Sequence, residues 1–408
     1  MKKTVYVLLL LASLTTLAGC VDNTISAVTG FVKESVITNK EPAFYRKEEY
    51  SSWVREELEQ LPEIQNMGFD LRSYNVSKFD LSQEERLKDV TFDTQTIWSE
   101  KLPSGFYPDE ILELGKNPGL KIQNLHQQGF TGKGVNIAIV DQALLLEHEE
   151  YKDNLMTYEL VHCSDPSAQM HGAAVTSIAV GKNCGVAPDA KVYYIASTFG
   201  TYKSEGNFDI DLTPMADSIL RILEINKQLP KEDNIKVISI SRGFDNTTKG
   251  GKEVFKAIEE AKKSDVFVIT TSNEETYGFN LMGLGREMTD SPDDLNSYKA
   301  GAFWAENFYY NDGFLLENTL LVPMDARTYA SFTAPTDYAF EASSGLSWAV
   351  PWLAGMYALC LQEVPDLTPE KFIKTAFETG DTISFDYNEK SYQLATVINP
   401  EKLLQSIQ

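Results

Sequence analysis

Four short apolar runs, separated by segments of helical periodicity, constrain the fold of this chain more than any other feature. The runs are rich in β-branched residues and too short for helices, and they cover residues 135–140, 192–196, 235–240 and 266–269. Such runs are typical of strands that are buried on both faces of a parallel sheet. Between them, apolar residues recur at helical spacing, as in the sets Met215, Ile219, Ile222 and Leu223 or Val254, Ile258 and Ala261. This alternation predicts an α/β fold with a doubly wound, mostly parallel sheet flanked by helices.

The first twenty residues have the pattern of an export signal. Lys2 and Lys3 precede an apolar run at residues 5–18, and small residues lead directly to Cys20. This run is shorter than the ~20 residues that a membrane-spanning helix needs. A cleaved signal is therefore the better interpretation of this segment.

The residues Leu17, Ala18, Gly19 and Cys20 resemble the lipobox of bacterial lipoproteins, whose cysteine becomes the acylated N-terminus. We therefore predict a lipoprotein signal peptide at residues 1–19 and lipidation of Cys20. Acyl chains contribute roughly 0.8 kcal/mol per buried methylene, so several chains would hold the protein at a bacterial cell membrane with its body outside the cytoplasm. The alternative is a soluble secreted protein in which Cys20 is incidental.

Residues 20–100 form a polar N-terminal extension or linker with one amphipathic stretch at residues 53–61. This extension could be a removed pro-segment, a stalk or a packed accessory element. The α/β pattern begins after it, and we assign residues 101–408 to one domain.

The net charge of the chain argues against one class of partner, nucleic acid. The chain has 59 acidic against 36 basic side chains and a net charge of −23, and such a field repels nucleic acid.

Once Cys20 is lipidated, Cys163, Cys184 and Cys360 remain, so at least one thiol is unpaired within a monomer. A disulfide between Cys163 and Cys184 stays open, because the sequence does not supply their geometry.

Polar residues stand where the predicted strands end. Asp141 follows the first run, Ser241 to Gly243 follow the third, and Asn273 follows the fourth. The carboxyl ends of parallel strands meet at one edge of the sheet, so these side chains are expected to lie together. Taken alone, an aspartate at such a position is commonly a helix N-cap or a loop residue.

Two further residues are candidates for nucleophilic catalysis. His171 begins a run of small residues that lets a helix pack closely on the sheet, and Ser347 stands near a helix start because Pro351 fits only an early helical position. Each has an ordinary explanation, as a structural histidine and a capping serine. A serine at a helix N-terminus is also suited to attack on a carbonyl, because the helix dipole favours the oxyanion that develops.

Together these residues resemble the subtilisin-like serine peptidases, or subtilases, in which aspartate, histidine and serine occur in this order along the chain. The resemblance covers roughly residues 118–405, a range that includes the motifs at residues 132–141, 171–175, 185–192, 237–243, 266–273 and 345–351. It implies a subtilisin-like fold, with Asp141, His171 and Ser347 as the catalytic triad and Asn273 as an oxyanion donor. It also implies that three residues line the substrate backbone: Ser241, Arg242 and Gly243.

The expected function is that of a membrane-anchored serine endopeptidase, which cleaves protein or peptide substrates through an acyl-enzyme. The alternative is a catalytically weak or inactive subtilase-fold lipoprotein that binds or regulates, because neighbours of the triad depart from the family pattern: Gln142, Ala143, Ala173, Ala174, Leu346 and Trp348. A nucleotide-binding module is disfavoured, since no glycine-rich phosphate loop follows the first strand.

Two charged features remain open. Arg242 occupies a position that is commonly apolar in subtilases, and it predicts tolerance of acidic residues upstream of the cleaved bond. The alternative is a surface arginine that balances an acidic protein. The carboxylates of Asp290, Asp293 and Asp294 could bind calcium, but solvated loop carboxylates are commoner, and we assign no metal or other cofactor.

Overall fold

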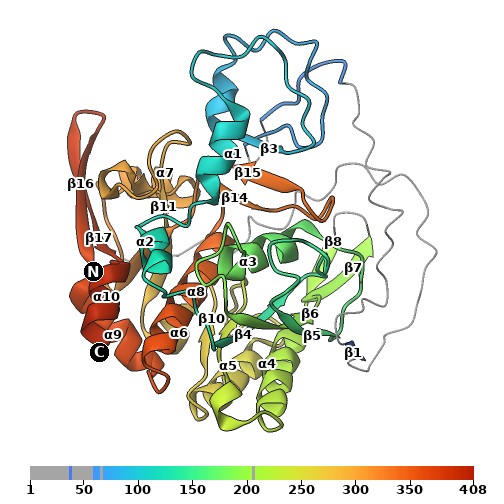
Figure 1. Cartoon of the computed structure of the whole chain (residues 1–408), viewed down its shortest axis with the longest axis vertical. Coiled ribbons are helices and arrows are strands. Elements are labelled where there is room, and N and C mark those ends of the chain that lie inside the picture. The colour runs from blue at the N-terminus through green and yellow to red at the C-terminus, as the bar shows by residue number, and fades with distance from the viewer. Residues whose placement is uncertain (1–35, 39–57, 65–67, 205–206) are drawn as a thin grey trace.

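The computed structural model describes residues 36–38, 58–64, 68–204 and 207–408 of the chain (Figure 1). The predicted signal peptide (1–19) and Cys20 lie outside the described residues. The predicted amphipathic stretch is described only from Leu58 to Leu61, which form no helix. Within the described part of the chain, no helix is long and apolar enough to cross a membrane.

A six-stranded sheet forms the centre of the molecule and confirms the predicted α/β fold. Its strand order is β1 (Val36–Thr38), β5 (Leu155–Leu160), β6 (Lys191–Ala196), β4 (Asn136–Asp141), β9 (Ile235–Ser239) and β10 (Phe267–Ile269). All neighbours are parallel except β1, which pairs with β5 in the antiparallel direction. The four predicted runs are the strands β4, β6, β9 and β10.

Each face of this sheet is covered by helices. Along β4, Ile137 and Ile139 point into one hydrophobic core and Ala138 and Val140 into another, because successive side chains of a strand alternate between faces. The first core contains α3 (Met170–Val180) and α8 (Ala349–Glu363), and the second contains α4 (Thr213–Asn226) and α5 (Gly251–Lys262). In Figure 1, α3 lies above strands β4 to β6, and α4 and α5 lie below them.

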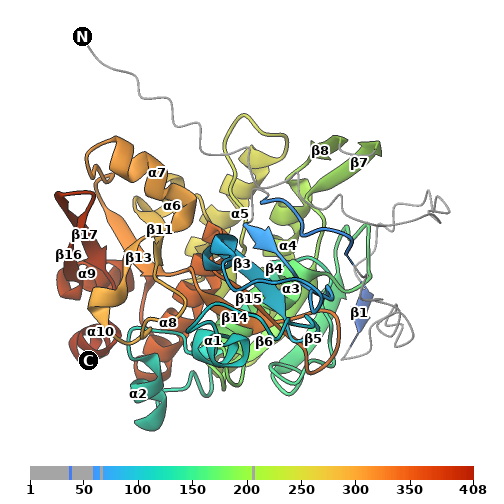
Figure 2. The same ribbon diagram turned by 90° about the horizontal axis from the view of Figure 1, so that it is seen from above.

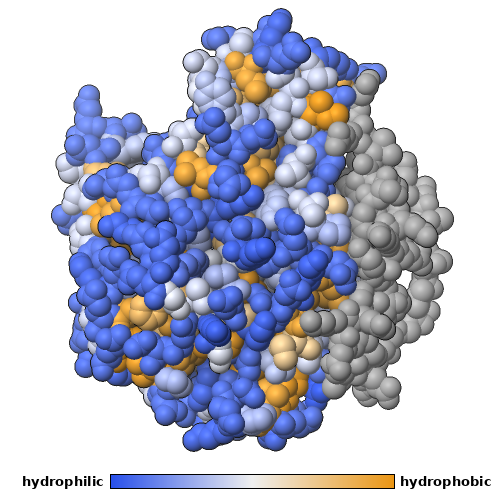
Figure 3. Space-filling model, in the orientation of Figure 1, coloured by the Kyte–Doolittle hydropathy of each residue, from blue (hydrophilic) through white to orange (hydrophobic). Residues whose placement is uncertain are grey.

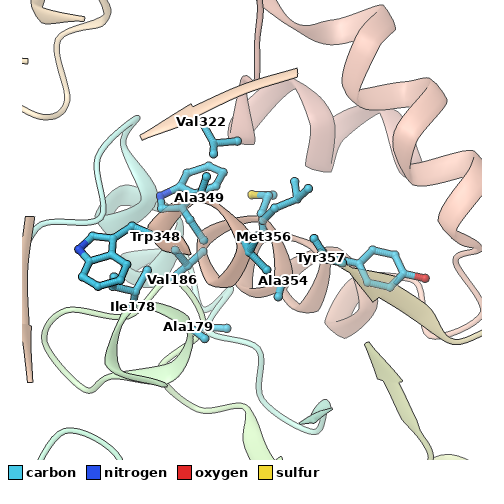
Figure 4. Close-up of a cluster of buried hydrophobic side chains, with 14 of the residues drawn as sticks. Ile178, Ala179, Val186, Val322, Trp348, Ala349, Ala354, Met356 and Tyr357 are labelled. Carbon is cyan, nitrogen blue, oxygen red and sulfur yellow. The ribbon is translucent and has the colours of Figure 1, made fainter. Parts of the chain in front are cut away.

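Helix α8 is the best-buried helix of the site-bearing region, since every residue from Ala349 to Leu361 is buried. Figure 4 shows its side chains, including Ala349, Ala354, Met356 and Tyr357, packed among residues of other elements. The Trp348 side chain lies at the start of this helix, beside Ile178 of α3 (Figure 4). The position of the helix is therefore held by close packing on several sides.

The chain between Asn273 and Ser347 carries strands that the sequence pattern did not predict. It supplies three strands of a second sheet, with the order β12 (Lys299–Ala300), β11 (Asn280–Gly285), β13 (Thr319–Pro323), β17 (Lys390–Val397) and β16 (Asp381–Tyr387). Strand β11 was not predicted because it contains glycines, which are weak strand formers. A Cβ atom at Gly283 would overlap the side chain of Met324, so glycine permits close packing here.

A third sheet joins the N-terminal extension to the rest of the molecule. Its order is β14 (Arg327–Ala330), β15 (Tyr338–Glu341), β3 (Val90–Asp93) and β2 (Phe69–Asp70). Strand β3 pairs with β15, and the rings of Phe92 and Phe340 lie 5.3 Å apart across that pair. Figure 2 shows β3 next to β15 and β14. The described part of the extension is thus packed against the main domain through a shared sheet and core.

The remaining elements complete the surface. They are the hairpin β7 (Gly200–Ser204) and β8 (Asn207–Ile210), and the helices α1 (Pro108–Lys116), α2 (Ile122–Gln127), α6 (Asn273–Tyr277), α7 (Ala302–Tyr310), α9 (Pro369–Thr379) and α10 (Pro400–Ile407). Short 3-10 helices are η2 (Glu85–Asp89), η3 (Lys231–Asp233), η4 (Leu295–Ser297) and η5 (Leu346–Trp348). The face seen in Figure 3 is mainly hydrophilic. Cys163, Cys184 and Cys360 are free thiols.

Candidate active site

Asp141 and His171 are placed by the two most regular elements of the site. Asp141 is the last residue of β4, and His171 is the second residue of α3. Helix α3 approaches the strand end closely because residue 172 is glycine: a Cβ atom there would lie 2.5 Å from the carbonyl oxygen of Gln142 and 2.6 Å from the hydroxyl of Tyr194. Both distances are too short for any side chain, so Gly172 permits the contact between the two catalytic candidates.

The imidazole of His171 is bonded to the carboxylate of Asp141. His171 Nδ1 and Asp141 Oδ1 are 2.7 Å apart, and Asp141 is only 4% exposed. A carboxylate only accepts hydrogen bonds, so Nδ1 carries the proton and Nε2 of the neutral ring is left as a base. Burial lowers the pKa of His171, but the charge and hydrogen bond of Asp141, with a further contribution from Glu341, outweigh it, and the pKa is raised overall.

Ser347 lies next to this pair without being bonded to it. It sits in the 3-10 helix η5, and the ring of the following residue, Trp348, meets His171 edge-on at 5.4 Å. The hydroxyl of Ser347 points to the carbonyl oxygen of Ser241 at 3.5 Å, while Ser241 Oγ donates to the Ser347 carbonyl oxygen at 2.8 Å. Among the hydrogen bonds of the described residues, none joins Ser347 to His171. Catalytic hydrogen bonds are often loose before substrate binds, and a rotation of the serine side chain would redirect its hydroxyl.

The side chain of Asn273 is occupied by a local turn. Asn273 follows β10 as the first residue of α6 and is 1% exposed. Its Nδ2 donates to the carbonyl oxygen of Thr270 at 2.6 Å, and its Oδ1 accepts from the Thr270 amide at 3.0 Å. One N–H of the carboxamide is not used in these bonds. The oxyanion role of Asn273 stays a prediction that depends on this second N–H.

The segment of residues 241–243 leaves the sheet beside the serine. The carbonyl oxygen of Arg242 accepts a hydrogen bond from Thr271 at 3.4 Å, and its amide donates to Ile240 at 2.7 Å. Ser272 Oγ bonds both the amide and the carbonyl of Phe244 at 2.9 Å. The two loops that follow β9 and β10 are therefore tied together, and the segment expected to line a substrate has a defined backbone.

A buried carboxylate close to the histidine was missed in the sequence. Glu341, the last residue of β15, is 1% exposed, and its Oε1 accepts a hydrogen bond from the Tyr329 hydroxyl at 2.7 Å. The Trp348 ring packs edge-on against Tyr329 at 5.3 Å, so Trp348 lies between this pair and His171. Burial raises the pKa of Glu341, against the opposing effect of Arg72 from the extension. A charged residue in the run Tyr338 to Glu341, six positions before Ser347, was the available signal.

Two of the three aspartates considered for calcium have structural partners. Asp293 accepts hydrogen bonds from the Lys121 amide at 2.7 Å and from Asn117 Nδ2 at 2.8 Å, and Asp294 caps η4 through the Asn296 amide. In the ranges that the structure describes, no group of three or more histidine, cysteine or acidic side chains is arranged to hold a metal ion. The carboxylates of Asp293 and Asp294 stabilise loop geometry in this structure.

A mostly parallel sheet with an aspartate, a histidine and a serine near its carboxyl edge, in that chain order, is the arrangement typical of serine-type hydrolases. The model of the subtilase family matches residues 132–388, which is more than half of the chain. The chain belongs to the subtilase family of serine-type peptidases.

A solved structure supports the fold. The chain is similar to fervidolysin from Fervidobacterium pennivorans, a keratinolytic enzyme related to subtilisin, with 15% identity and a TM-score of 0.51. That match covers 72% of this chain and 47% of the fervidolysin chain. The prenylagaramide maturation protease PagA matches at 14% identity with a TM-score of 0.49, over 71% of this chain and 98% of the PagA chain. At such identities the fervidolysin match supports the shared fold alone.

Proposed function

We propose that this protein is a serine endopeptidase that hydrolyses peptide bonds through an acyl-enzyme, with Ser347 as nucleophile and His171 as general base. The observation that carries the proposal is the 2.7 Å contact between His171 Nδ1 and buried Asp141, at the strand edge where Ser347 also lies. This contact holds the ring in the tautomer whose Nε2 can accept the serine proton.

The reaction follows from these positions. Ser347 Oγ attacks the carbonyl carbon of the substrate while its proton moves to His171 Nε2, and the carbonyl oxygen becomes an oxyanion. The imidazolium, stabilised by Asp141, then gives that proton to the leaving amine as the peptide C–N bond breaks. Water then attacks the resulting ester while its proton moves to His171 Nε2. The imidazolium gives this proton to Ser347 Oγ as the ester bond breaks, which releases the acid product and restores Ser347.

The oxyanion requires two donors in this mechanism. The Ser347 backbone N–H and the second N–H of Asn273 Nδ2 are the candidates, because both belong to elements that begin at this edge of the sheet. Donors fixed before the reaction stabilise developing charge more effectively than mobile ones. The tie between Asn273 and Thr270 supplies this rigidity.

An active-site phosphonate probe that labels nucleophilic serines tests the assignment. The purified protein is expected to be labelled once, at a peptide that contains Ser347, and to lose labelling in Ser347→Ala. Ser344→Ala is the matched control, because Ser344 lies in the same loop and is buried, yet has no assigned role in the reaction. Folded protein that takes up no probe would favour the alternative of a noncatalytic binding or regulatory protein.

We also propose that the protein is exported and attached to a bacterial cell membrane through lipidated Cys20, with the peptidase domain outside the cytoplasm. The support is the sequence Leu17 to Cys20 after an apolar run. Metabolic labelling with a palmitate analogue, followed by membrane fractionation, tests this. Incorporation of label and recovery in membranes are expected for the full chain, and both are expected to be lost in Cys20→Ala, with Cys163→Ala as control.

A further inference from the structure

Arg242 differs from every other arginine in the described part of the chain. The other five, Arg72, Arg86, Arg221, Arg286 and Arg327, all donate side-chain hydrogen bonds to carboxylates or to backbone carbonyl groups. The guanidinium of Arg242 makes no hydrogen bond and no ion pair with any described residue, although it is partly buried. In a chain with a net charge of −23, a cation without an acidic partner is unexpected.

The place of Arg242 relates it to the reaction. It follows Ser241, whose hydroxyl donates to the Ser347 carbonyl and whose own carbonyl faces Ser347 Oγ. Hydrogen bonds to Ile240 and Thr271 hold the Arg242 backbone at the ends of β9 and β10. Its positive charge also acts on the ring of His171, whose pKa it lowers. The cation therefore belongs to the immediate surroundings of the catalytic residues.

Three acidic groups of this region have other partners. Asp141 is bonded to His171, and Glu341 accepts from Tyr329. Asp245, three residues after Arg242, accepts hydrogen bonds from Thr247 and Thr248. The other interpretation of the sequence was a surface arginine that balances an acidic protein. Arg242 is only partly exposed, and no described carboxylate pairs with its guanidinium.

We propose that Arg242 binds a carboxylate of the substrate next to the scissile bond, so that this peptidase selects acidic peptides. The inference rests on the proposed peptidase function and names its substrate class. A guanidinium presents parallel N–H donors that match a carboxylate in a bidentate pair, and partial burial strengthens such a pair relative to one in water. The carboxylate has two chemical sources: an aspartate or glutamate side chain, or the C-terminal carboxylate of a short peptide.

The experiment compares peptides that differ by one group. Fluorogenic peptides of one parent sequence carry Glu or Gln at each position on either side of the cleaved bond, with a free or an amidated C-terminus. For the native enzyme, kcat/KM is expected to be about tenfold or more higher for Glu than for Gln at one position, as for a charge-assisted hydrogen bond. Arg242→Gln is expected to abolish that ratio, and Arg242→Lys to retain part of it.

Charge reversal makes the test independent of overall activity. Arg242→Glu is expected to prefer Lys over Glu at the same position, which general damage to the enzyme does not produce. Lys249→Gln is the matched control: it removes one exposed positive charge elsewhere and is expected to keep the native ratio of Glu to Gln. A ratio that depends on the free C-terminus and disappears in Arg242→Gln would assign the bound group to the terminal carboxylate.

The outcomes separate the two proposals. If Ser347 reacts with the phosphonate probe and Gln peptides are cleaved, but Arg242→Gln and Arg242→Glu keep the native selectivity, the carboxylate site is wrong and the peptidase function stands. If the native protein neither reacts with the probe nor cleaves any peptide, the peptidase function fails, and the substrate assignment fails with it.

Discussion

The two halves of the candidate site differ in how far they are assembled. On one side, Asp141 and His171 are joined at 2.7 Å. On the other side, the side chains of Ser347 and Asn273 make hydrogen bonds to nearby backbone groups. The Ser347 hydroxyl donates to the Ser241 carbonyl oxygen, and the Asn273 carboxamide donates to the Thr270 carbonyl oxygen. The acid–base half is therefore preformed, whereas the half that meets the carbonyl group is occupied by internal bonds.

The difference follows from the elements that carry each half. Asp141 ends a central strand, and His171 lies in the first turn of a helix whose packing on that strand end is set by Gly172. Ser347 lies in a three-residue 3-10 helix and Asn273 in a five-residue helix, whose polar groups are satisfied by local bonds. The Ser347 hydroxyl must leave the Ser241 carbonyl oxygen before it attacks a substrate, whereas Asn273 keeps its bonds to Thr270 and offers its second N–H. The second half is therefore completed only on binding.

The largest expected effect comes from breaking the preformed half. Asp141→Asn is expected to reduce kcat by about 10⁴-fold, because an amide can hold the ring in the wrong tautomer. Steady-state kinetics on a peptide substrate measure this.

Asp217→Asn is the control for that loss, because Asp217 Oδ2 and His162 Nε2 form a similar pair at 2.8 Å outside the site. It should leave kcat near the native value. Equal losses in the two variants would contradict the special role of the Asp141 pair.

Removing the carboxamide tests the other half. Asn273→Ala is expected to lower kcat by about 10²- to 10³-fold, as for loss of one oxyanion donor. Asn226→Ala is the matched control. The Asn226 carboxamide also makes two hydrogen bonds to one residue: its Nδ2 donates to the Ile235 carbonyl oxygen, and its Oδ1 accepts from the Ile235 amide. If both variants lose the same stability and the same activity, Asn273 has a structural role alone.

A smaller effect is expected at the contact that holds the serine loop. Ser241→Ala removes the 2.8 Å hydrogen bond to the Ser347 carbonyl, which is worth about 0.5–1.5 kcal/mol. We expect a several-fold fall in kcat/KM and a small loss in the free energy of unfolding, measured by urea titration. An unchanged kcat/KM would show that this bond does not position Ser347.

The smallest effect is a displacement in pH. Because the pKa of His171 is raised, the acidic limb of kcat/KM against pH should lie above about 6.5, since the ring must be neutral to act as base. In Asp141→Asn the limb should move to lower pH. A limb that is the same in both proteins would contradict the assignment of His171 as the titrating base.

The raised pKa of His171 also predicts how the stability of the fold depends on pH. A raised folded-state pKa means that protonation of His171 favours the folded state below about pH 6.5. That contribution is lost as the pH rises through the folded pKa. His171→Ala should therefore cost more stability at pH 5 than at pH 9, as measured by urea titration.

The sequence was most informative where the pattern is local. The four predicted strands and the helices between them were recognised from runs and periods a few residues long, and the strand ends located Asp141, Ser241 and Asn273. The second sheet was not recognised, since β11 relies on glycines that pack against distant residues. The pairing of β3 with β15 was also not foreseen, because it joins segments about 250 residues apart, and such contacts leave no period in the sequence.

The amino-acid order by itself determined the α/β architecture and the succession of an aspartate, a histidine and a serine. Short apolar runs indicate buried strands, and the order of residues along the chain is part of the sequence. Only the tertiary structure decided which side chains have partners. Among the residues that the structure describes, it joins Asp141 to His171, engages Asn273 with Thr270 and leaves Arg242 without an acidic partner. The physical reason is that a hydrogen bond depends on distance and direction in space, and residues far apart in the chain acquire these only when the sheet and its helices pack together.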